Sequence, residues 1–439
     1  MRPRSPPRPQ SDNLVNSEQL EIHCQSAVKI SWTISKSLLR NGTLVVWRGN
    51  KSPHLIRALS DVSKSIYDPK QRRFFLSSPV FIFWFGYFLI STRGLQQSLV
   101  LAFLKSARTR VIILMENYDK KFQSKAEETT WMRLVESYLV DIQVVKVQHG
   151  QELRRQVVPE KKFGTLAVWG QYSADSFPAF GRSEAHYVVT GPLQDSRYRQ
   201  LRGNSVPQKI WDICIISTVK SEEWWGPTVS QRRKGYDLLM KYLVDLVDEL
   251  GLSVAIATTV DRFTIDGENQ AELERRYFED RFGSRCFFPD SSETFGGLMP
   301  DLLVEREKVA GVKERYATYA LSDSSGVTIG ATGSSLWESF GRGNKILAVN
   351  LSPNSALNFP ISGPWALGEA TYEEFRKAYC DLASMEEGEF ERISRGARNH
   401  LIYYDDRDRP ENRLNRLVRA LLNHGDPLRA KDEVERVNR

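Results

Sequence analysis

Short β-branched runs alternate with amphipathic stretches along most of this chain, and the pattern restarts after a polar stretch at residues 201–209. Such alternation is typical of βα units stacked on a parallel sheet. In the first half we expect a helix at residues 125–139 and strands at residues 43–47, 110–115, 143–147 and 165–169. In the second half we expect a helix at residues 235–250, where leucines recur at helical spacing, and strands at residues 211–217, 252–258, 286–288, 326–329 and 345–349.

With 439 residues, 41% of them hydrophobic, the chain is long enough for two cores. We therefore predict an α/β fold of two Rossmann-like domains that face each other across a cleft. Open parallel sheets bind ligands beyond the carboxyl ends of their strands, so the chemistry should lie in that cleft. The predicted units are a disordered Arg/Pro leader (1–20), an acceptor-side domain (21–200), a linker (201–209), a donor-binding domain (210–425) whose end could fold back, and a charged tail (426–439).

The charge and cysteine content limit the partners and the compartment. A net charge of +7 suits an anionic ligand or a membrane face but is too diffuse for a dedicated nucleic-acid binder. The four cysteines are far apart and lie near no histidine cluster, which predicts neither a zinc site nor a disulfide framework. The Arg/Pro leader is followed by no apolar signal-peptide core. We expect a cytoplasmic protein that needs no metal and no cofactor.

Residues 74–90 form the most apolar segment, FFLSSPVFIFWFGYFLI, with basic residues on both sides. Three interpretations are open. The leading one is a buried helix and strand; another is an interfacial helix that exposes Trp84 and Tyr87 to the membrane face. The third, a membrane span, would be at the lower limit of length.

His149 ends the apolar strand in VVKVQHG, between Gln148 and Gly150. An imidazole at the carboxyl edge of a sheet, before a glycine that permits a sharp turn, is well placed to act as a general base near neutral pH. The alternative is a structural histidine bonded to a loop carbonyl.

The stretch from Gly326 to Asn350 offers an anion site. A strand runs into Gly333, Ser334 and Ser335, and a helix follows. Small residues before a helix leave backbone N–H groups for phosphate oxygens, and the helix dipole adds positive charge. In this interpretation Glu338 accepts hydrogen bonds from ribose hydroxyls, and Arg342 and Lys345 are candidate partners for phosphate charge. An ordinary capped helix is the alternative.

Two further strand ends carry polar groups. In YVVTGPLQD, Gly191 and Pro192 end a strand and lead to Asp195, which we interpret as a hinge wall near the cleft or simply a turn. Glu116, after the strand VIILM, could act as a second acid or base, or precede an Asn117 cap.

The order of VVKVQHG, FGTLAVWGQYSADSF, YVVTGPLQD and GSSLWESFGRGNKILAVN resembles GT-B glycosyltransferases of bacterial surface-polysaccharide synthesis, over roughly residues 110–350. The group includes capsule Kdo-transferase-like and CDP-glycerol glycerophosphotransferase-like proteins. The resemblance implies that His149 lies in the cleft, and that Ser334, Ser335 and Glu338 grip a nucleotide-activated donor. The chain departs from better-defined members because it lacks a second histidine near the donor helix.

From this resemblance we expect a transferase that moves a sugar from a nucleotide-sugar to a growing glycan or lipid-linked glycan acceptor, with a peripheral inner-membrane contact. In an inverting reaction His149 takes the acceptor proton; in a retaining one it only binds or orients. The alternatives are a polyol-phosphate transferase that uses CDP-glycerol, and a non-catalytic glycan- or partner-binding module. No D-x-D pair stands at a convincing strand end, which favours metal independence.

Overall fold

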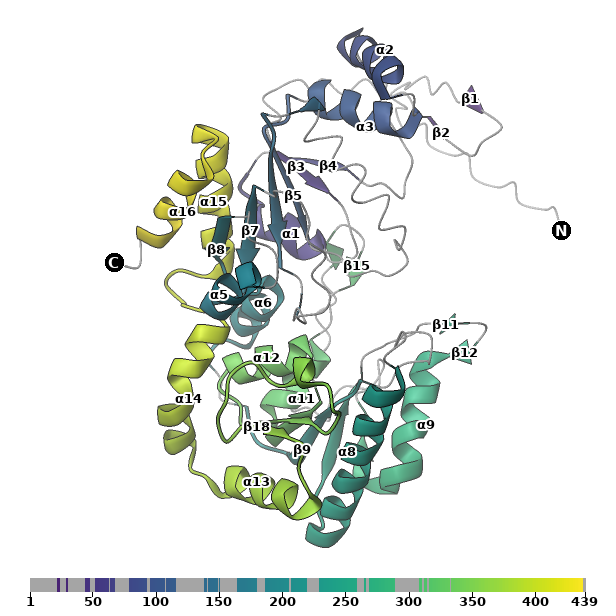
Figure 1. The fold of residues 1–439 in the computed structure, drawn as a ribbon, viewed down its shortest axis with the longest axis vertical. Coiled ribbons are helices and arrows are strands. Elements are labelled where there is room, and N and C mark those ends of the chain that lie inside the picture. Colours follow the sequence, from purple (N-terminus) through teal and green to yellow (C-terminus); the bar gives the residue numbers. More distant parts are fainter. Residues whose placement is uncertain are drawn as a thin grey trace, which may run out of the picture.

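The computed structural model contains two parallel sheets, one above the other in Figure 1. It describes residues 22–23, 29–30, 44–47, 52–62, 64–67, 79–92, 95–106, 108–115, 138–139, 141–148, 150, 164–179, 186–204, 207–218, 229–258, 264–265, 268–288, 308–309, 312–313, 316–331 and 333–436.

The first sheet has six parallel strands in the order β4-β3-β5-β6-β7-β8. Its strands are β3 (Leu44–Trp47), β4 (Lys64–Tyr67), β5 (Val111–Met115), β6 (Gln143–Val147), β7 (Thr165–Val168) and β8 (His186–Val189). The central run VIILM is buried at every position, as expected for a strand covered on both faces. The strands predicted at residues 43–47, 110–115, 143–147 and 165–169 are present, and so is the strand predicted in YVVTGPLQD, as β8. Strand β4 was not predicted, because KSIY carries no apolar run.

The second sheet also has six parallel strands, in the order β13-β10-β9-β16-β17-β18. They are β9 (Trp211–Ile216), β10 (Val254–Ala257), β13 (Cys286–Phe287), β16 (Ser325–Gly330), β17 (Ile346–Asn350) and β18 (Ala366–Gly368). All five strands predicted here are present, and β18 is additional. Two parallel six-stranded sheets confirm the predicted α/β class with two Rossmann-like domains.

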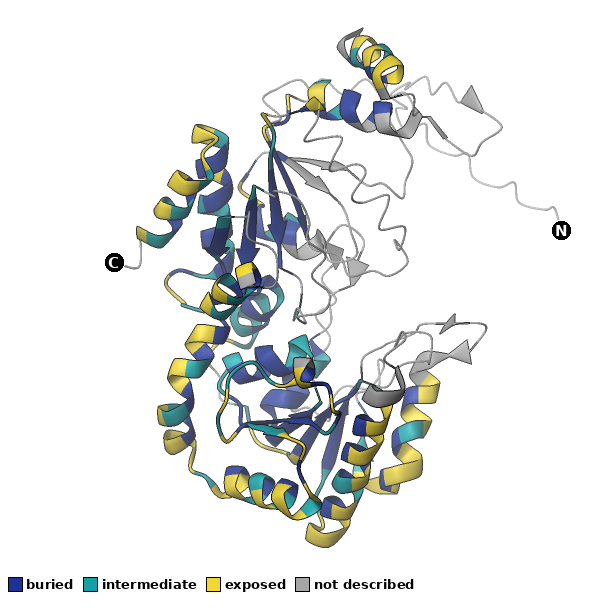
Figure 2. Cartoon of the chain, in the orientation of Figure 1, coloured by how far each residue is buried: buried dark blue, intermediate teal, exposed yellow. Residues whose placement is uncertain are grey.

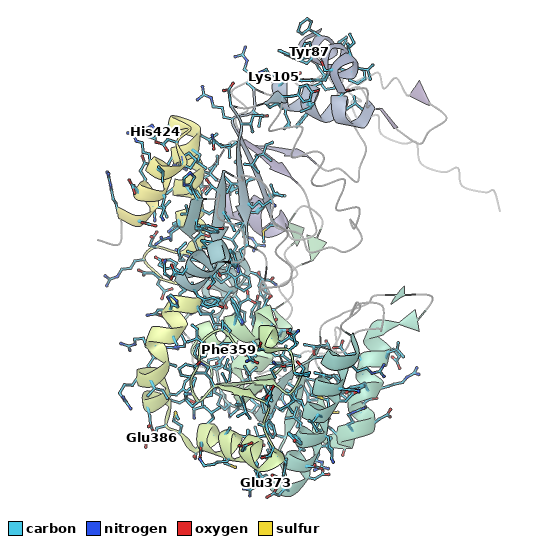
Figure 3. The ribbon with its side chains drawn as sticks, viewed as in Figure 1. Tyr87, Lys105, Phe359, Glu373, Glu386 and His424 are labelled. Atoms are coloured by element: carbon cyan, nitrogen blue, oxygen red, sulfur yellow. The ribbon has the colours of Figure 1, made fainter. Side chains whose placement is uncertain are left out.

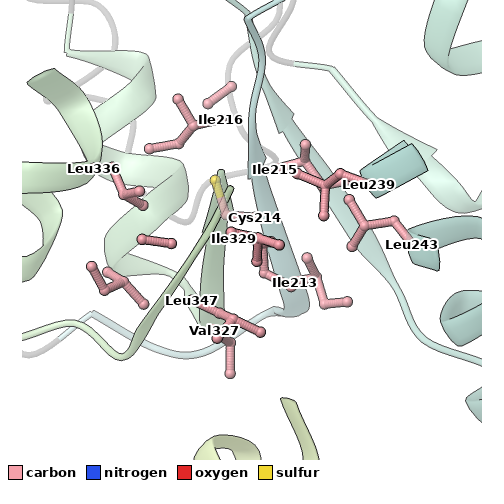
Figure 4. Close-up of a cluster of buried hydrophobic side chains, with 14 of the residues drawn as sticks. Ile213, Cys214, Ile215, Ile216, Leu239, Leu243, Val327, Ile329, Leu336 and Leu347 are labelled. Atoms are coloured by element: carbon pink, nitrogen blue, oxygen red, sulfur yellow. The ribbon is translucent and has the colours of Figure 1, made fainter. Parts of the chain in front are cut away.

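Helices cover both faces of the second sheet. They are α8 (Val229–Leu250), α9 (Gln270–Phe282), α11 (Ala317–Asp323), α12 (Ser334–Gly341), α13 (Tyr372–Ser384) and α14 (Glu387–Leu401). Figure 4 shows Ile215 beside Leu239 of α8, whereas Ile216 lies on the side of Leu336 of α12. Successive strand residues thus pack against opposite helical layers, which explains why the last four residues of β9, ICII, form a continuous apolar run rather than an alternating one.

The first sheet carries helices α1 (Ser52–Ala58), α5 (Gln171–Ala179) and α6 (Leu193–Arg202). Helix α6 runs into the predicted linker, and Gly203 ends it with a φ of 62°. The helix predicted at residues 125–139 lies almost entirely outside the described residues, as does the predicted leader. Because α6 extends to Arg202, the segment that links the two domains is shorter than the predicted residues 201–209.

The end of the chain returns to the first domain. Helices α15 (Pro410–His424) and α16 (Pro427–Glu435) bury Leu417 and Val434 in one cluster with Val111 and Val145 of the first sheet. Figure 1 shows both helices, in yellow, alongside that sheet. The second domain therefore ends before the predicted residue 425, and the chain crosses back to the first domain near residues 402–409. The predicted tail is helical over Pro427–Glu435. Helix α15 can pack on the first sheet because its apolar residues form a stripe along one face.

The aromatic segment forms helix α2 (Pro79–Thr92), which packs on α3 (Leu95–Ser106). Phe81 and Phe88 are buried with Leu101 and Leu104, so the core interpretation holds for one face of α2. Within the described part of the chain, every helix is too short or too polar to span a bilayer.

Candidate functional site where the two sheets meet

The turn after β6 touches the turn before α12. A Cβ atom built on Gly150 would lie 2.7 Å from Ser334 Oγ, closer than real Cβ atoms approach such atoms. Gly150 follows a central strand of the first sheet, and Ser334 follows β16, a central strand of the second. The carboxyl edges of the two sheets therefore face each other at this point, which is where open α/β sheets bind ligands.

Gln148 holds the shape of the first turn. Its side chain is 1% exposed. The Trp169 backbone N–H donates to Gln148 Oε1 at 2.8 Å, and the Trp169 indole N–H donates to the Gln148 carbonyl at 2.9 Å. Gln148 Nε2 in turn donates to the Gly150 carbonyl at 3.0 Å. These three bonds clamp both residues that flank His149, so the backbone on either side of it is tightly defined.

His149 and Glu116, the predicted acid/base residues, lie outside the described residues. Their positions in the sequence nevertheless tie them to described neighbours. His149 stands between Gln148 and Gly150, and Glu116 directly follows β5, the strand next to β6. Both roles stay predictions.

Gly333 starts the second turn in a conformation that only glycine adopts readily, with a φ of 145°. Apart from its chain neighbours, no atom of the described residues lies within 4 Å of a Cβ built there. The carbonyl of Gly333 accepts the first helical bonds from Leu336 and Trp337. Ser334 and Ser335 follow, both half-buried, at the positive end of the α12 dipole.

Glu338 lies one turn further along α12, behind the two serines. Its side chain is 5% exposed, and Tyr319 donates its hydroxyl to Glu338 Oε1 at 2.9 Å. Burial, together with the nearby Glu338 charge, raises the pKa of Tyr319 well above its ordinary value, so the phenol stays protonated and keeps donating. Tyr319 thus fixes the orientation of the carboxylate predicted to meet ribose.

Arg342 corrects the sequence analysis. Its side chain is fully buried, and it forms ion pairs with Asp195 Oδ1 at 2.8 Å and with Asp323 Oδ1 at 2.7 Å. It lies at the far end of α12 from the serine turn. Its guanidinium is therefore engaged within the protein rather than directed at a phosphate. Lys345 likewise reaches Met385 and Glu387, away from the turn.

Asp195 is a domain-interface residue rather than a cleft wall. Its side chain is fully buried between Arg342 of the second domain and Arg199 on its own helix α6. Gly191, just before α6, has a φ of 93°, and a Cβ there would meet the Tyr403 carbonyl at 2.5 Å. Gly191 thus lies beside the segment that returns to the first domain, and the hinge role of Gly191 and Asp195 stays a prediction.

Asp323 is the central residue that sequence reasoning missed. It accepts from Arg342, from Arg202 at 2.6 Å, from Tyr198 at 3.1 Å and from Asn344 at 2.7 Å. Burial alone would raise the pKa of Asp323, but Arg342 and Arg202 outweigh burial and lower it to about 2. The sequence offers one signal only, a lone aspartate at the end of an otherwise uncharged helix, ATYALSD.

Among the residues that the structure describes, no three or more His, Cys, Asp or Glu side chains are grouped so that they could hold a metal ion. The described residues offer a helix N-terminus, two serine hydroxyls and an oriented carboxylate on one side, and the hydrogen-bonded Gln148 and Gly150 on the other. A positive helix end with hydroxyl donors suits a phosphate-containing ligand. The fold is that of a two-domain α/β protein whose two parallel sheets face each other at their carboxyl edges, a GT-B-like architecture.

No protein-family model matches the chain, and neither does any curated protein sequence. Among solved structures, it is similar to a putative UDP-N-acetylglucosamine 2-epimerase from Listeria monocytogenes, with 10% identity over 88% of this chain and 98% of the other, and a TM-score of 0.48. It is also similar to a UDP-GlcNAc 2-epimerase from Methanocaldococcus jannaschii, with 11% identity, coverage of 81% and 98%, and a TM-score of 0.40. A variant of the wall teichoic acid polymerase TagF has 10% identity, coverage of 93% and 92%, and a TM-score of 0.42. These identities and TM-scores are too low to indicate an activity for this chain.

Proposed function

We propose that the chain is a GT-B-type glycosyltransferase that moves a sugar from a nucleotide-sugar to a growing surface polysaccharide or glycolipid. The observation that carries this proposal is the contact between Gly150 and Ser334. It joins the turn that bears the candidate base to the turn that bears the candidate phosphate site.

The donor would bind the second domain. Its phosphates would meet the N-terminus of α12, where backbone N–H groups and the hydroxyls of Ser334 and Ser335 can stabilise the negative charge of the leaving group. Glu338 would accept hydrogen bonds from ribose hydroxyls. Among the described residues, no atom beyond its chain neighbours crowds Gly333, which supports close approach of a ligand to the backbone.

The acceptor would enter from the first domain. In an inverting displacement, the acceptor oxygen attacks the anomeric carbon, the bond to the nucleotide phosphate breaks, and His149 takes the acceptor proton. The Gln148 clamp supports this role, because a base must be held within hydrogen-bond reach of the proton it removes. A lipid-linked acceptor would be met at the cytoplasmic face of a membrane.

The proposal is tested by a thermal-shift panel of UDP-, CMP-, CDP- and GDP-sugars with CDP-glycerol, followed by mass determination of products. A donor that binds only the folded chain adds about 2.7 kcal/mol to the free energy of unfolding at 100 times its Kd, and the melting temperature rises as a result. His149→Ala should keep the donor's shift but lower the transfer rate by about 10²–10⁴-fold.

His424→Ala is the matched control, since His424 lies on α15 far from the contact and should leave both readouts unchanged. No shift with any donor would reject the proposal. Transfer of glycerol phosphate from CDP-glycerol, in place of a sugar, would identify the polyol-phosphate alternative. A His149→Ala protein that retains full activity would remove the base from the mechanism.

A further inference from the structure

Helix α2 leaves one apolar face open. Ile82 is 54% exposed, Phe83 66%, Tyr87 51% and Ile90 82%, whereas Phe81 and Phe88 on the opposite face are buried. Figure 2 shows this helix at one end of the molecule, with exposed residues along its outer side. A soluble surface helix normally places polar residues on its outer face, so the open face of α2 is unusual.

The buried face of α2 is firmly attached, so the open face is held in place. Phe88 packs against Trp84 and against Tyr138, with ring centroids 5.7 Å and 6.0 Å apart. The Tyr138 hydroxyl also donates to the carbonyl of Ser91 at 3.2 Å. The exposed residues therefore project from a helix that the domain core supports.

The sequence around this helix is rich in cations. From Pro69 to Met115 the sequence carries seven Lys or Arg residues and neither Asp nor Glu. Lys105 and Arg108 are exposed, and the Lys105 ammonium lies 5.4 Å from the centre of the Trp84 ring. An apolar face with exposed cations beside it is complementary to an anionic lipid surface, in which acyl chains lie beneath negative headgroups.

The position of the hairpin suits such a contact. Figure 3 shows Tyr87 and Lys105 at the end of the molecule opposite Glu373 and Glu386 of the second domain. Helix α3 leads into the start of β5, so the hairpin lies toward the amino edge of the first sheet, away from the edge that faces Ser334. Docking through α2 would therefore leave the facing sheet edges uncovered.

We propose that the hairpin α2–α3 is a membrane-docking element, which inserts Ile82, Phe83, Tyr87 and Ile90 into the interface of a bilayer rich in anionic lipid. Lys105 and Arg108 contact the headgroups. This proposal names the surface through which the chain would reach the membrane that the proposed function places it on. It does not depend on the identity of the donor or on the reaction.

The test is co-sedimentation of the full chain with vesicles of phosphatidylglycerol and phosphatidylcholine, compared with phosphatidylcholine alone. The wild type should bind the anionic vesicles, and the double variant Phe83→Glu/Ile90→Glu should bind about 100-fold more weakly, because two large apolar side chains no longer enter the lipid. Lys105→Gln/Arg108→Gln should bind anionic vesicles about 10-fold more weakly, and its binding should depend less on salt than that of the wild type.

Leu428→Glu is the matched control, since Leu428 is 59% exposed on α16 and should leave binding unchanged. The donor thermal shift, measured on the same variants, should be unaffected, which separates failure of docking from failure of the proposed function. The proposal is overturned if the wild type binds neither vesicle, if Phe83→Glu/Ile90→Glu binds as the wild type does, or if light scattering shows a dimer that this variant dissociates.

Discussion

At the scale of single residues, Gly150 matters because it has no side chain where the two domains approach each other. The sequence suggested a glycine that permits a sharp turn at this position. The structure adds a steric reason for glycine there, because a Cβ atom would lie 2.7 Å from Ser334 Oγ. The contact between the two domains at the candidate site thus depends on a missing Cβ atom.

We expect Gly150→Ala to destabilise the chain by about 1–3 kcal/mol, the usual cost of overpacking. Ser334→Ala in the same chain should recover most of that loss, since it removes the Oγ atom 2.7 Å from the new Cβ and leaves Ser334 Cβ at an ordinary 3.9 Å. Thermal denaturation of the two single variants and the double variant measures the coupling. Strictly additive effects would show that the two turns do not touch.

At the scale of elements, α15 shows how far an amphipathic pattern can be taken. Its leucines predict a helix with one apolar stripe, and the helix is present. The pattern is silent about which core receives the stripe. The structure places it in the first domain, where Leu414, Leu417 and Leu421 pack with strands from the start of the chain.

Leu417→Ala should therefore lower the free energy of unfolding by about 2–5 kcal/mol, because it leaves a cavity in the core of the first domain. Leu428→Ala, at a residue 59% exposed on the neighbouring helix, should change it by less than about 0.5 kcal/mol. Denaturant titration checks both variants. Equal effects would mean that α15 is not part of that core.

At the scale of the whole molecule, a buried network joins the domains. Arg342 of the second domain contacts Asp195 of the first, and Asp323 of the second accepts hydrogen bonds from Arg202 and Tyr198 of the first. Removing one partner of such a network leaves buried charge uncompensated. The relative position of the two sheet edges therefore depends on charges well away from the candidate site.

The network predicts a pH dependence. The pKa of Asp323 is lowered from 3.8 to about 2, so its contribution to stability is complete above about pH 4 and is lost as the pH falls toward 2. Asp323→Asn should destabilise the chain at pH 7 by about 3–5 kcal/mol, and its deficit relative to wild type should shrink by about 2 kcal/mol between pH 4 and pH 2.

Asp381→Asn is the control, because Asp381 forms an exposed ion pair with Lys377 and should cost less than about 1 kcal/mol at any pH. Unfolding measured at a series of pH values distinguishes the two variants. A deficit for Asp323→Asn that stays constant down to pH 2 would contradict the lowered pKa.

Local chemistry in the sequence was enough to predict most of the strands, helix α8 and the two-domain α/β class. The run VIILM favours a strand because it is short and rich in β-branched residues, and the leucine periodicity of α8 favours a helix. Gly333 and the serines after it were also recognisable, since a glycine-rich turn before a helix has a known backbone chemistry.

The tertiary structure alone decided which of these groups meet. Arg342 was expected at a phosphate and is instead paired with Asp195 and Asp323, because a cation's partner depends on which helix packs beside it. The contact of Gly150 with Ser334 and the open face of α2 arise in the same way. Each depends on residues far apart along the chain, and local periodicity carries no information about such distances.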